Sequence, residues 1–185
     1  MIIGIVGKSG CGKSSLARYL AETKDNTVYL DIDKVGHQAN ETEIVKTKLR
    51  QQFGEFIFVD GKIDRKRLGA IVFNSDEAMQ ILKEITWAEM KKIIDQFIAE
   101  HQGKNIILDY ALLPETEYFE DCDVTILIDV PYEVRLERVM KRDGISSEKF
   151  LARESKSLDY SKYQFDLVVE NIDYDKAKEK VRQLV

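Results

Sequence analysis

The chain begins with the apolar run Ile2–Val6, and the eight residues GKSGCGKS follow at once as Gly7–Ser14. Three glycines and two lysines in eight residues suit neither a helix nor a strand. The stretch matches the pattern G-x-x-x-x-G-K-[ST], and apolar residues such as Leu16 and Leu20 share one helical face behind it. In such a loop, glycines let backbone N–H groups turn toward phosphate oxygens, and the helix N-terminus adds positive partial charge. The sequence therefore predicts a nucleotide-binding loop between a strand and a helix.

Individual positions of this loop have distinct predicted tasks. Lys13 is expected to reach the β- and γ-phosphates of a nucleotide, and the Ser14 hydroxyl is expected to bind Mg²⁺. Cys11 has no neighbouring base, so nucleophilic chemistry is not expected of it. The other residues of the loop expected to contact the nucleotide, besides these three, are Gly10, Gly12 and Ser15.

Runs rich in Ile, Val and Leu alternate with helical patterns along the chain, as buried parallel strands and their connections require. From about Asp76 to His101, apolar residues recur at helical spacing, and Gly103 suits the C-terminal cap. Roughly 70 residues separate the second and third runs, more than one crossover needs, so a mostly helical insertion is expected there. The expected fold is α/β, a P-loop NTPase-type parallel five-stranded sheet flanked by helices. Its expected strands are Ile2–Val6, Thr27–Leu30, Asn105–Leu108, Val124–Val130 and Leu167–Val169.

Composition narrows the possible partners and compartment. A chain of 185 residues fits one domain. Its net charge of −5 argues against general nucleic-acid binding, so an anionic ligand must be met by local positive charge. The two cysteines, Cys11 and Cys122, fit no metal-ligand spacing and favour a reduced compartment. Since apolar runs are too short for a membrane span or a signal peptide, a cytoplasmic protein without membrane attachment is expected.

Missing motifs and the length of the chain indicate which class of protein with this nucleotide-binding loop (P-loop) is expected. Asp33-Lys-Val-Gly36 superficially reads D-x-x-G, but no Asn-Lys-x-Asp guanine motif accompanies it, so a GTPase is not favoured. An ATP-driven motor or a DNA-handling ATPase would usually be larger or more basic. A small-molecule kinase needs only a sheet, an acceptor subdomain and a lid, and it fits the length best.

Two carboxylates follow the second strand in the segment Tyr29–Asp33, at the sheet edge where α/β proteins build their sites. Alternation along an extended chain would put Asp31 and Asp33 on the same side. In phosphoryl transfer, one carboxylate can accept the proton of an attacking hydroxyl, and another can help to hold hydrated Mg²⁺. An Asp-rich turn that caps the next helix is the alternative interpretation.

With these residues in view, the chain resembles the dephospho-CoA kinases, which use ATP to phosphorylate the ribose 3′-hydroxyl of dephospho-CoA. The resemblance covers residues 2 to about 172, and Lys8 stands where that family commonly has a glycine. It rests on an ordered set of segments: DIDKVGH (31–37), FG (53–54), DGKIDR (60–65), DYALLPE (109–115), CD (122–123), RDG (142–144) with Ser147, Glu148 and Arg153, and Asp166 to Asn171.

The resemblance implies a domain plan and a set of ligands. It implies a single kinase domain with a core at about 1–35, 104–131 and 160–185, an acceptor-binding helical insertion at about 36–103, and a short helical lid at about 132–159. It implies ATP and Mg²⁺ as cofactors and dephospho-CoA as the acceptor. No nucleic-acid or membrane partner is expected, and the protein is expected to be a monomer or a weak homo-oligomer.

The resemblance also implies roles for particular residues. Asp33 is expected to be the general base, and Lys13 and Arg142 are the other expected catalytic residues. The acceptor is expected at Asp31, Asp33, His37, Arg65 and Leu113, the nucleotide beyond the loop at Arg142, Arg153 and Asn171, and Mg²⁺ at Ser14 and Asp31.

Ordinary structural alternatives remain open for these residues. Arg65 belongs to a basic cluster that a solvated helix face would also explain, and His37 could face solvent. Arg142 and Arg153 could lie on an exposed helix, and Asn171 could be a simple turn residue. At the level of function, a kinase for a nucleoside or sugar and a degenerate ATP-binding module also remain open.

Overall fold

The computed structural model describes residues 1–183, which divide into two compact units. The first unit holds Met1–Asp31 together with the chain from Gly103 onward, and the second unit holds Ile32–Gln102. The second unit overlaps the helical insertion expected at about 36–103. Over the described residues, no helix is both long enough and apolar enough to cross a bilayer.

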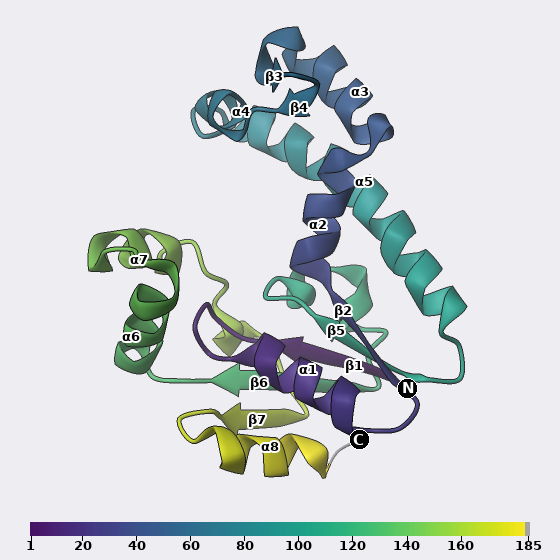
Figure 1. Cartoon of the computed structure of the whole chain (residues 1–185), viewed down its shortest axis with the longest axis vertical. Helices are drawn as coiled ribbons and strands as arrows, with labels where there is room; N and C mark the ends of the chain where they lie inside the picture. The colour runs from purple at the N-terminus through teal and green to yellow at the C-terminus, as the bar shows by residue number, and fades with distance from the viewer. Residues whose placement is uncertain (184–185) are drawn as a thin grey trace. The chain divides into compact units, whose positions relative to one another are not determined.

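A five-stranded parallel sheet in the order β2-β5-β1-β6-β7 forms the centre of the first unit (Figure 1). Each strand lies within one residue of its expected bounds, because each is a buried apolar run. Since all strands are parallel, their carboxyl ends meet at one edge of the sheet. The fold class expected from the sequence is thus confirmed. The strands are β1 (Ile2–Val6), β2 (Thr27–Asp31), β5 (Asn105–Asp109), β6 (Val124–Asp129) and β7 (Leu167–Glu170).

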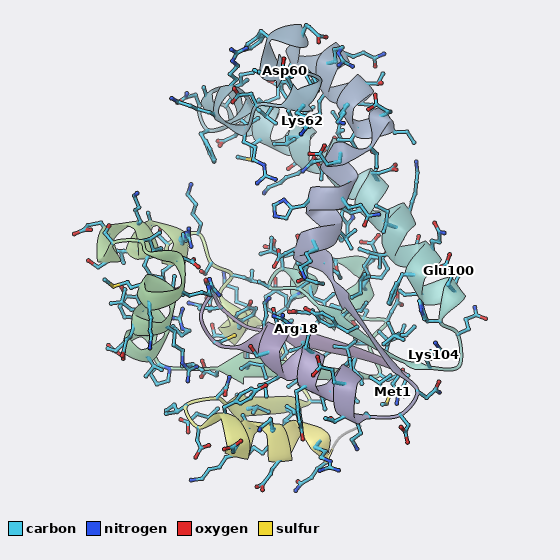
Figure 2. The ribbon with its side chains drawn as sticks, in the orientation of Figure 1. Met1, Arg18, Asp60, Lys62, Glu100 and Lys104 are labelled. Atoms are coloured by element: carbon cyan, nitrogen blue, oxygen red, sulfur yellow. The ribbon has the colours of Figure 1, made fainter. Side chains whose placement is uncertain are left out.

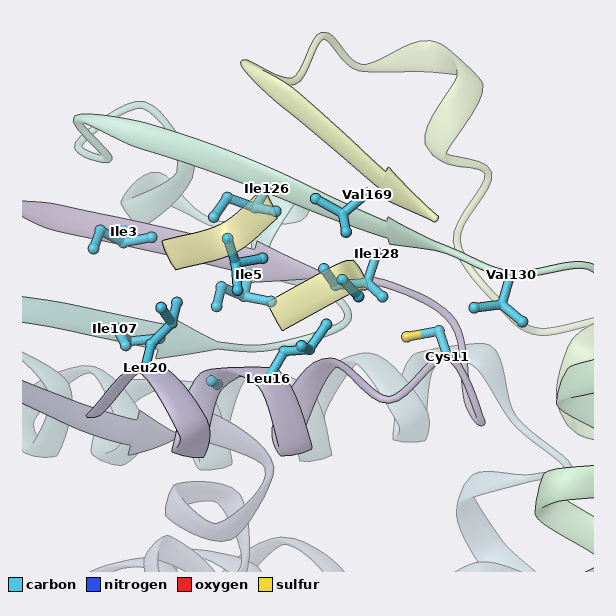
Figure 3. Packing of buried hydrophobic residues seen from close by; sticks show 13 residues of the cluster. Ile3, Ile5, Cys11, Leu16, Leu20, Ile107, Ile126, Ile128, Val130 and Val169 are labelled. Atoms are coloured by element: carbon cyan, nitrogen blue, oxygen red, sulfur yellow. The ribbon is translucent and has the colours of Figure 1, made fainter. Parts of the chain in front are cut away.

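Helices α1 (Lys13–Thr23) and α8 (Tyr174–Arg182) pack on one face of this sheet and enclose the main core. Leu16 of α1 is fully buried in the same cluster as Ile5 of β1 and Ile128 of β6, as Figure 3 shows. These apolar contacts fix α1 directly behind the glycine-rich loop, so the core sets where the N-terminus of α1 lies relative to the edge of the sheet.

The segment expected to form the lid consists of two helices joined at a glycine. Helix α6 ends at Gly144, whose φ of 64° gives the left-handed cap that glycine favours, and its N–H donates to Met140 O. Helix α7 then begins after Ser146, whose hydroxyl accepts from Lys149 N. The two helices are α6 (Tyr132–Asp143) and α7 (Ser147–Glu154). The first unit also contains the 3₁₀ turns η2 (Leu113–Glu115), η3 (Glu117–Phe119) and η4 (Tyr160–Lys162).

The second unit is mostly helical and has its own apolar core, which includes Val45, Leu49, Leu68 and Val72. Its short hairpin turns at Asp60 and Gly61, whose φ values are 50° and 72°. Asp60 is labelled in Figure 2. The elements are α2 (Ile32–Glu41), α3 (Glu43–Phe53), η1 (Glu55–Ile57), β3 (Phe58–Val59), β4 (Lys62–Ile63), α4 (Arg65–Val72) and α5 (Asp76–Glu100).

One expectation about local geometry is wrong. Strand β2 ends at Asp31 and helix α2 begins at Ile32, so Asp33 lies in the first turn of a helix and not in an extended segment. The period-two alternation that would have put Asp31 and Asp33 on one side therefore does not apply. A carboxylate in the first turn of a helix is electrostatically favoured there, which explains why a helix starts at this point.

Candidate active site

The glycine-rich loop between β1 and α1 adopts backbone conformations that only glycine tolerates well. Gly10 and Gly12 have φ values of 84° and 86°, in the left-handed region. A Cβ on Gly12 would lie 2.4 Å from Nδ2 of Asn171, so the loop approaches β7 too closely for any side chain there. Gly12 gives α1 no side-chain cap, and the first turn of α1 contains no acidic residue. Neither a capping side chain nor an acidic residue of the first turn therefore competes with an anion for the N-terminus of α1.

Lys13 and Ser14 lie together beside a buried carboxylate. Nζ of Lys13 lies 2.9 Å from Oδ1 of Asp109, the last residue of β5, and 3.4 Å from Oγ of Ser14. The Asp109 side chain is fully buried. Sequence reasoning gave Asp109 no role, although an acid ending an apolar strand was a signal for one. The ion pair holds the lysine at the carboxyl edge of the sheet.

A second carboxylate ends the neighbouring strand. Asp31 of β2 pairs in register with Asp109 of β5, so two acidic residues lie side by side at this edge. Carboxylate and hydroxyl oxygens are ligands that Mg²⁺ accepts, and Ser14 and Asp31 are of this kind. Within residues 1–183, no three His, Cys, Asp or Glu side chains come close enough to hold a metal ion by themselves.

Asp109 has a second partner in Tyr29 of β2. The Tyr29 hydroxyl donates to Oδ2 of Asp109 at 2.9 Å. Burial raises the pKa of Tyr29, and the adjacent Asp109 carboxylate raises it further. The tyrosine therefore remains a neutral donor at any working pH.

Asn171 and Cys11 support the loop from inside the protein. Nδ2 of Asn171 donates to the carbonyl of Cys11 at 2.7 Å, and the Asn171 side chain is buried. The Cys11 thiol packs in the main core, and burial raises its pKa to about 11. The Cys11 side chain thus offers a ligand no surface, and its backbone N–H donates to the carbonyl of Lys8 at 3.1 Å. Asn171 holds the loop in place, whereas sequence reasoning had expected it to contact the nucleotide.

Helices α6 and α7 are tied to the glycine-rich loop through Glu154 at the end of α7. Its carboxylate accepts from both terminal nitrogens of Arg135 in α6, each at 2.8 Å, and from Nζ of Lys8 at 2.8 Å. These hydrogen bonds lower the pKa of Glu154 to about 2, and those from Arg135 have the largest effect. Arg135 also donates to the carbonyls of Val130 and Ser9. Lys8 has no positive φ, so a side chain is tolerated at this position of the loop.

The two arginines expected in the lid meet at one carboxylate. Asp143 accepts two hydrogen bonds from Arg142, at 2.7 and 3.1 Å, and one from Arg153 at 2.8 Å. The hydrogen bonds from Arg142 and then Arg153 hold the pKa of Asp143 well below its usual range. Both arginine side chains are more than half exposed, at 62% and 51%. Arg142 and Arg153 therefore form one cationic group at the junction of α6 and α7.

A model of the dephospho-CoA kinase family matches residues 1–176 of the chain. The chain belongs to the dephospho-CoA kinase family. It is 31% identical over 175 residues to a dephospho-CoA kinase of Dehalococcoides mccartyi. This match covers 92% of this chain and 87% of the relative. A dephospho-CoA kinase of Aquifex aeolicus is 37% identical over 165 residues, covering 84% of this chain and 80% of the relative. Glycine-loop residues 7–14 are thus the nucleotide-binding loop of a kinase and transferase family.

Solved structures share this fold, and one of them is a dephospho-CoA kinase. TT1252 from Thermus thermophilus superposes with a TM-score of 0.87 at 28% identity, over all of this chain and 95% of that one. A dephospho-CoA kinase from Campylobacter jejuni gives a TM-score of 0.62 at 25% identity, over 99% of this chain and 94% of that one. A shikimate kinase from Bacteroides thetaiotaomicron, at 13% identity and a TM-score of 0.59, is similar in fold alone.

The second unit of this kinase family member brings together two residues that sequence reasoning assigned to the acceptor. Nη2 of Arg65, at the start of α4, lies 3.0 Å from Nδ1 of His37 in α2. A guanidinium can only donate, so Nδ1 accepts and the ring proton of His37 lies on Nε2. Both side chains are exposed. Arg65 and His37, 28 residues apart in the sequence, therefore form one exposed polar pair.

Leu113 does not fit the expectation of an acceptor contact. Its side chain is fully buried, and a side chain built on Gly4 would lie 2.7 Å from Leu113 Cδ2. Leu113 therefore packs directly against the backbone of β1 and offers a ligand no side-chain surface. The resemblance implied an acceptor contact for Leu113, but burial against β1 accounts for a hydrophobic residue at this position.

Proposed function

We propose that this protein transfers the γ-phosphoryl group of ATP to the ribose 3′-hydroxyl of dephospho-CoA, giving CoA and ADP. The observation that carries the proposal is the ion pair between Lys13 and the buried Asp109, in a phosphate-binding loop within a chain of the dephospho-CoA kinase family. The loop lysine is thereby held at the carboxyl edge of the sheet, where ligands of α/β proteins bind.

In this proposal the loop binds the phosphates of ATP. Backbone N–H groups around Gly10 and Gly12 and at the start of α1 receive phosphate oxygens, with Ser15 in that first turn. Lys13 reaches the β- and γ-phosphates and stabilises charge on the transferred group. The support is the uncapped helix N-terminus and the position of the Lys13 ammonium beside Ser14.

The cations of the lid complete the ATP site. Arg142 and Arg153 are paired with Asp143, and their exposed guanidiniums can exchange that carboxylate for phosphate oxygens. Such cations offset the charge that spreads over the equatorial oxygens during transfer. Arg135 is not available for this task, because Glu154 and two backbone carbonyls already occupy it.

Mg²⁺ fits the residues present, with the Ser14 hydroxyl and the Asp31 carboxylate as its protein ligands. When bound, the ion supplies neutralisation of phosphate charge and orientation of the transferred group.

Asp33 is the proposed general base. It would accept the proton of the 3′-hydroxyl as that oxygen attacks the γ-phosphorus. Its position in the first turn of α2 favours the ionised carboxylate that a base requires, because the helix N-terminus carries positive partial charge. Phosphoryl transfer through a loose transition state needs only modest help from a base, so orientation of the hydroxyl is part of this role.

Arg65 and His37 are the proposed contacts to the phosphates of the acceptor. Dephospho-CoA carries a pyrophosphate, and an exposed arginine fixed by a hydrogen bond is pre-oriented for such a group. Nucleoside and sugar acceptors without phosphate have no use for this charge. The free thiols of Cys11 and Cys122 support the cytoplasm as the compartment.

The proposal is tested by offering purified protein ATP, Mg²⁺ and one acceptor at a time. The acceptors are dephospho-CoA, adenosine, AMP, pantothenate and shikimate, and products are identified by mass spectrometry. We expect CoA to form from dephospho-CoA in preference to any other product. Phosphorylation of another acceptor with dephospho-CoA untouched would overturn the acceptor assignment but keep a P-loop kinase. Binding of ATP without any transfer would indicate a degenerate binding module.

A further inference from the structure

Tyr29 lies in the middle of β2 and contributes to the face of the sheet that packs against α1. Its strand pairs with β5 so that Tyr29 faces Ile107 and Asp31 faces Asp109. Residues two apart on a strand share a face, so the side chains of Tyr29 and Asp109 lie on the same side of the sheet. This register brings the Tyr29 hydroxyl within 2.9 Å of Asp109 Oδ2.

The two oxygens of Asp109 therefore have different partners. Oδ1 lies 2.9 Å from the Lys13 ammonium, and Oδ2 accepts from the Tyr29 hydroxyl. Asp109 is 0% exposed, so solvent cannot replace either partner. The hydroxyl draws negative charge toward Oδ2 and fixes the rotation of a carboxylate whose terminal torsion is otherwise broad.

We propose that Tyr29 is a positioning residue for phosphoryl transfer, acting through Asp109 on Lys13. By sharing the charge of Asp109, its hydroxyl weakens the hold of that carboxylate on the lysine, so that Lys13 can turn to the phosphates of ATP. Without the hydroxyl, a buried carboxylate would have lost a donor and would retain the ammonium more strongly. The inference rests on the proposed phosphoryl transfer for its purpose, but its contacts involve only the loop and two strands.

The first experiment compares Tyr29→Phe with the wild-type protein. Affinity for a fluorescent ATP analogue is measured without acceptor, and kcat and KM are measured for both substrates. We expect ATP affinity and kcat/KM for ATP to fall about 10-fold, the scale of one hydrogen bond to a charged group. KM for dephospho-CoA should stay within twofold. Tyr19→Phe is the matched control, because Tyr19 also packs partly buried against the main core, and this variant should bind ATP as the wild type does.

The second experiment separates positioning from packing by a double-mutant cycle with Asp109→Asn. If Tyr29 acts through Asp109, adding Tyr29→Phe to the Asp109→Asn protein should change ATP affinity less than twofold. Additive losses, or wild-type ATP affinity in the Tyr29→Phe single variant, would overturn the proposal. Because ATP affinity is read without acceptor, the cycle still decides the role of Tyr29 if the wild-type protein phosphorylates none of the acceptors offered.

Discussion

Arg135 and Glu154 form a two-pronged ion pair, with both terminal guanidinium nitrogens 2.8 Å from the two carboxylate oxygens. Arg135 belongs to α6 and Glu154 ends α7, so this pair holds the two helices together. The same carboxylate accepts from Lys8 in the glycine-rich loop. Helices α6 and α7 and the phosphate-binding loop therefore meet at one acidic side chain, and Arg135 adds a direct hydrogen bond to Ser9 of the loop.

Glu154→Gln should destabilise the folded protein by about 3 kcal/mol at pH 7, because the pKa of Glu154 falls from 4.5 to about 2 on folding. A lowered pKa stabilises the folded state above the unfolded value, and that stabilisation is lost as pH falls through the folded value. The gap between wild type and variant should thus be constant above about pH 5 and shrink toward pH 2. Urea unfolding from pH 7 to pH 3 measures it. The exposed Glu137, on the neighbouring helix α6, is the control, and a Glu137→Gln variant should resemble wild type. A pH-independent gap would contradict the assignment.

Gly12→Ala should abolish ATP binding and destabilise the protein by several kcal/mol, about 1–2 of which is left-handed backbone strain. The remainder comes from the new Cβ, which would lie 2.4 Å from Asn171 Nδ2. Gly61→Ala is the matched control, because Gly61 has a φ of 72° but nothing within 4 Å of an added Cβ. Gly61→Ala should lose only the stability that the backbone strain costs, and it should keep full ATP affinity. Thermal unfolding and nucleotide titration of both variants distinguish the two costs, and equal losses would show that contact with Asn171 is unimportant.

Asp33→Asn should lower turnover by about 10²-fold, near the lower end of the range for removal of a general base. ATP affinity should change little, because the proposed role of Asp33 is toward the hydroxyl and not the nucleotide. Steady-state kinetics and ATP titration test this in parallel. If Asp31→Asn shows that loss while Asp33→Asn keeps full turnover, the roles of the two carboxylates are exchanged.

Arg65→Ala should raise KM for dephospho-CoA about 10-fold or more, as expected for loss of a charge-assisted hydrogen bond to phosphate. KM for ATP should not change. Lys66→Ala is the control for net charge, because Lys66 is the next exposed cation on α4. Initial-rate measurements with each substrate varied decide the matter. Equal effects of the two substitutions would mean that only the summed charge of the helix counts.

The sequence was a good guide wherever local pattern decides structure. The five strands and the loop around Lys13 could be predicted because buried parallel strands are continuous apolar runs and the loop has its own residue code. The position of Asp33 was missed because the end of a strand and the start of a helix are set within one residue. Leu113 was assigned to the acceptor, although it is buried, because an apolar side chain can equally line a site or fill a core.

The polar contacts around the site could not be predicted, because they join residues far apart in the chain. Asp109 meets Lys13 and Tyr29 across 96 and 80 positions, and Lys8 meets Glu154 across 146. The sequence around each of these residues does not indicate which distant residue it contacts. Only the strand order and the close approach of α6 to the loop create these pairs.

The central place of β1 has a consequence for synthesis on the ribosome. Its two neighbours in the sheet, β5 and β6, begin at Asn105 and Val124. Strand β1 can therefore form its sheet hydrogen bonds only after the whole second unit has been synthesised. The contiguous segment Ile32–Gln102 has its own core and can condense during that wait. ATP can therefore assist only the late stage of folding, since Lys13 finds Asp109 only after β5 has emerged.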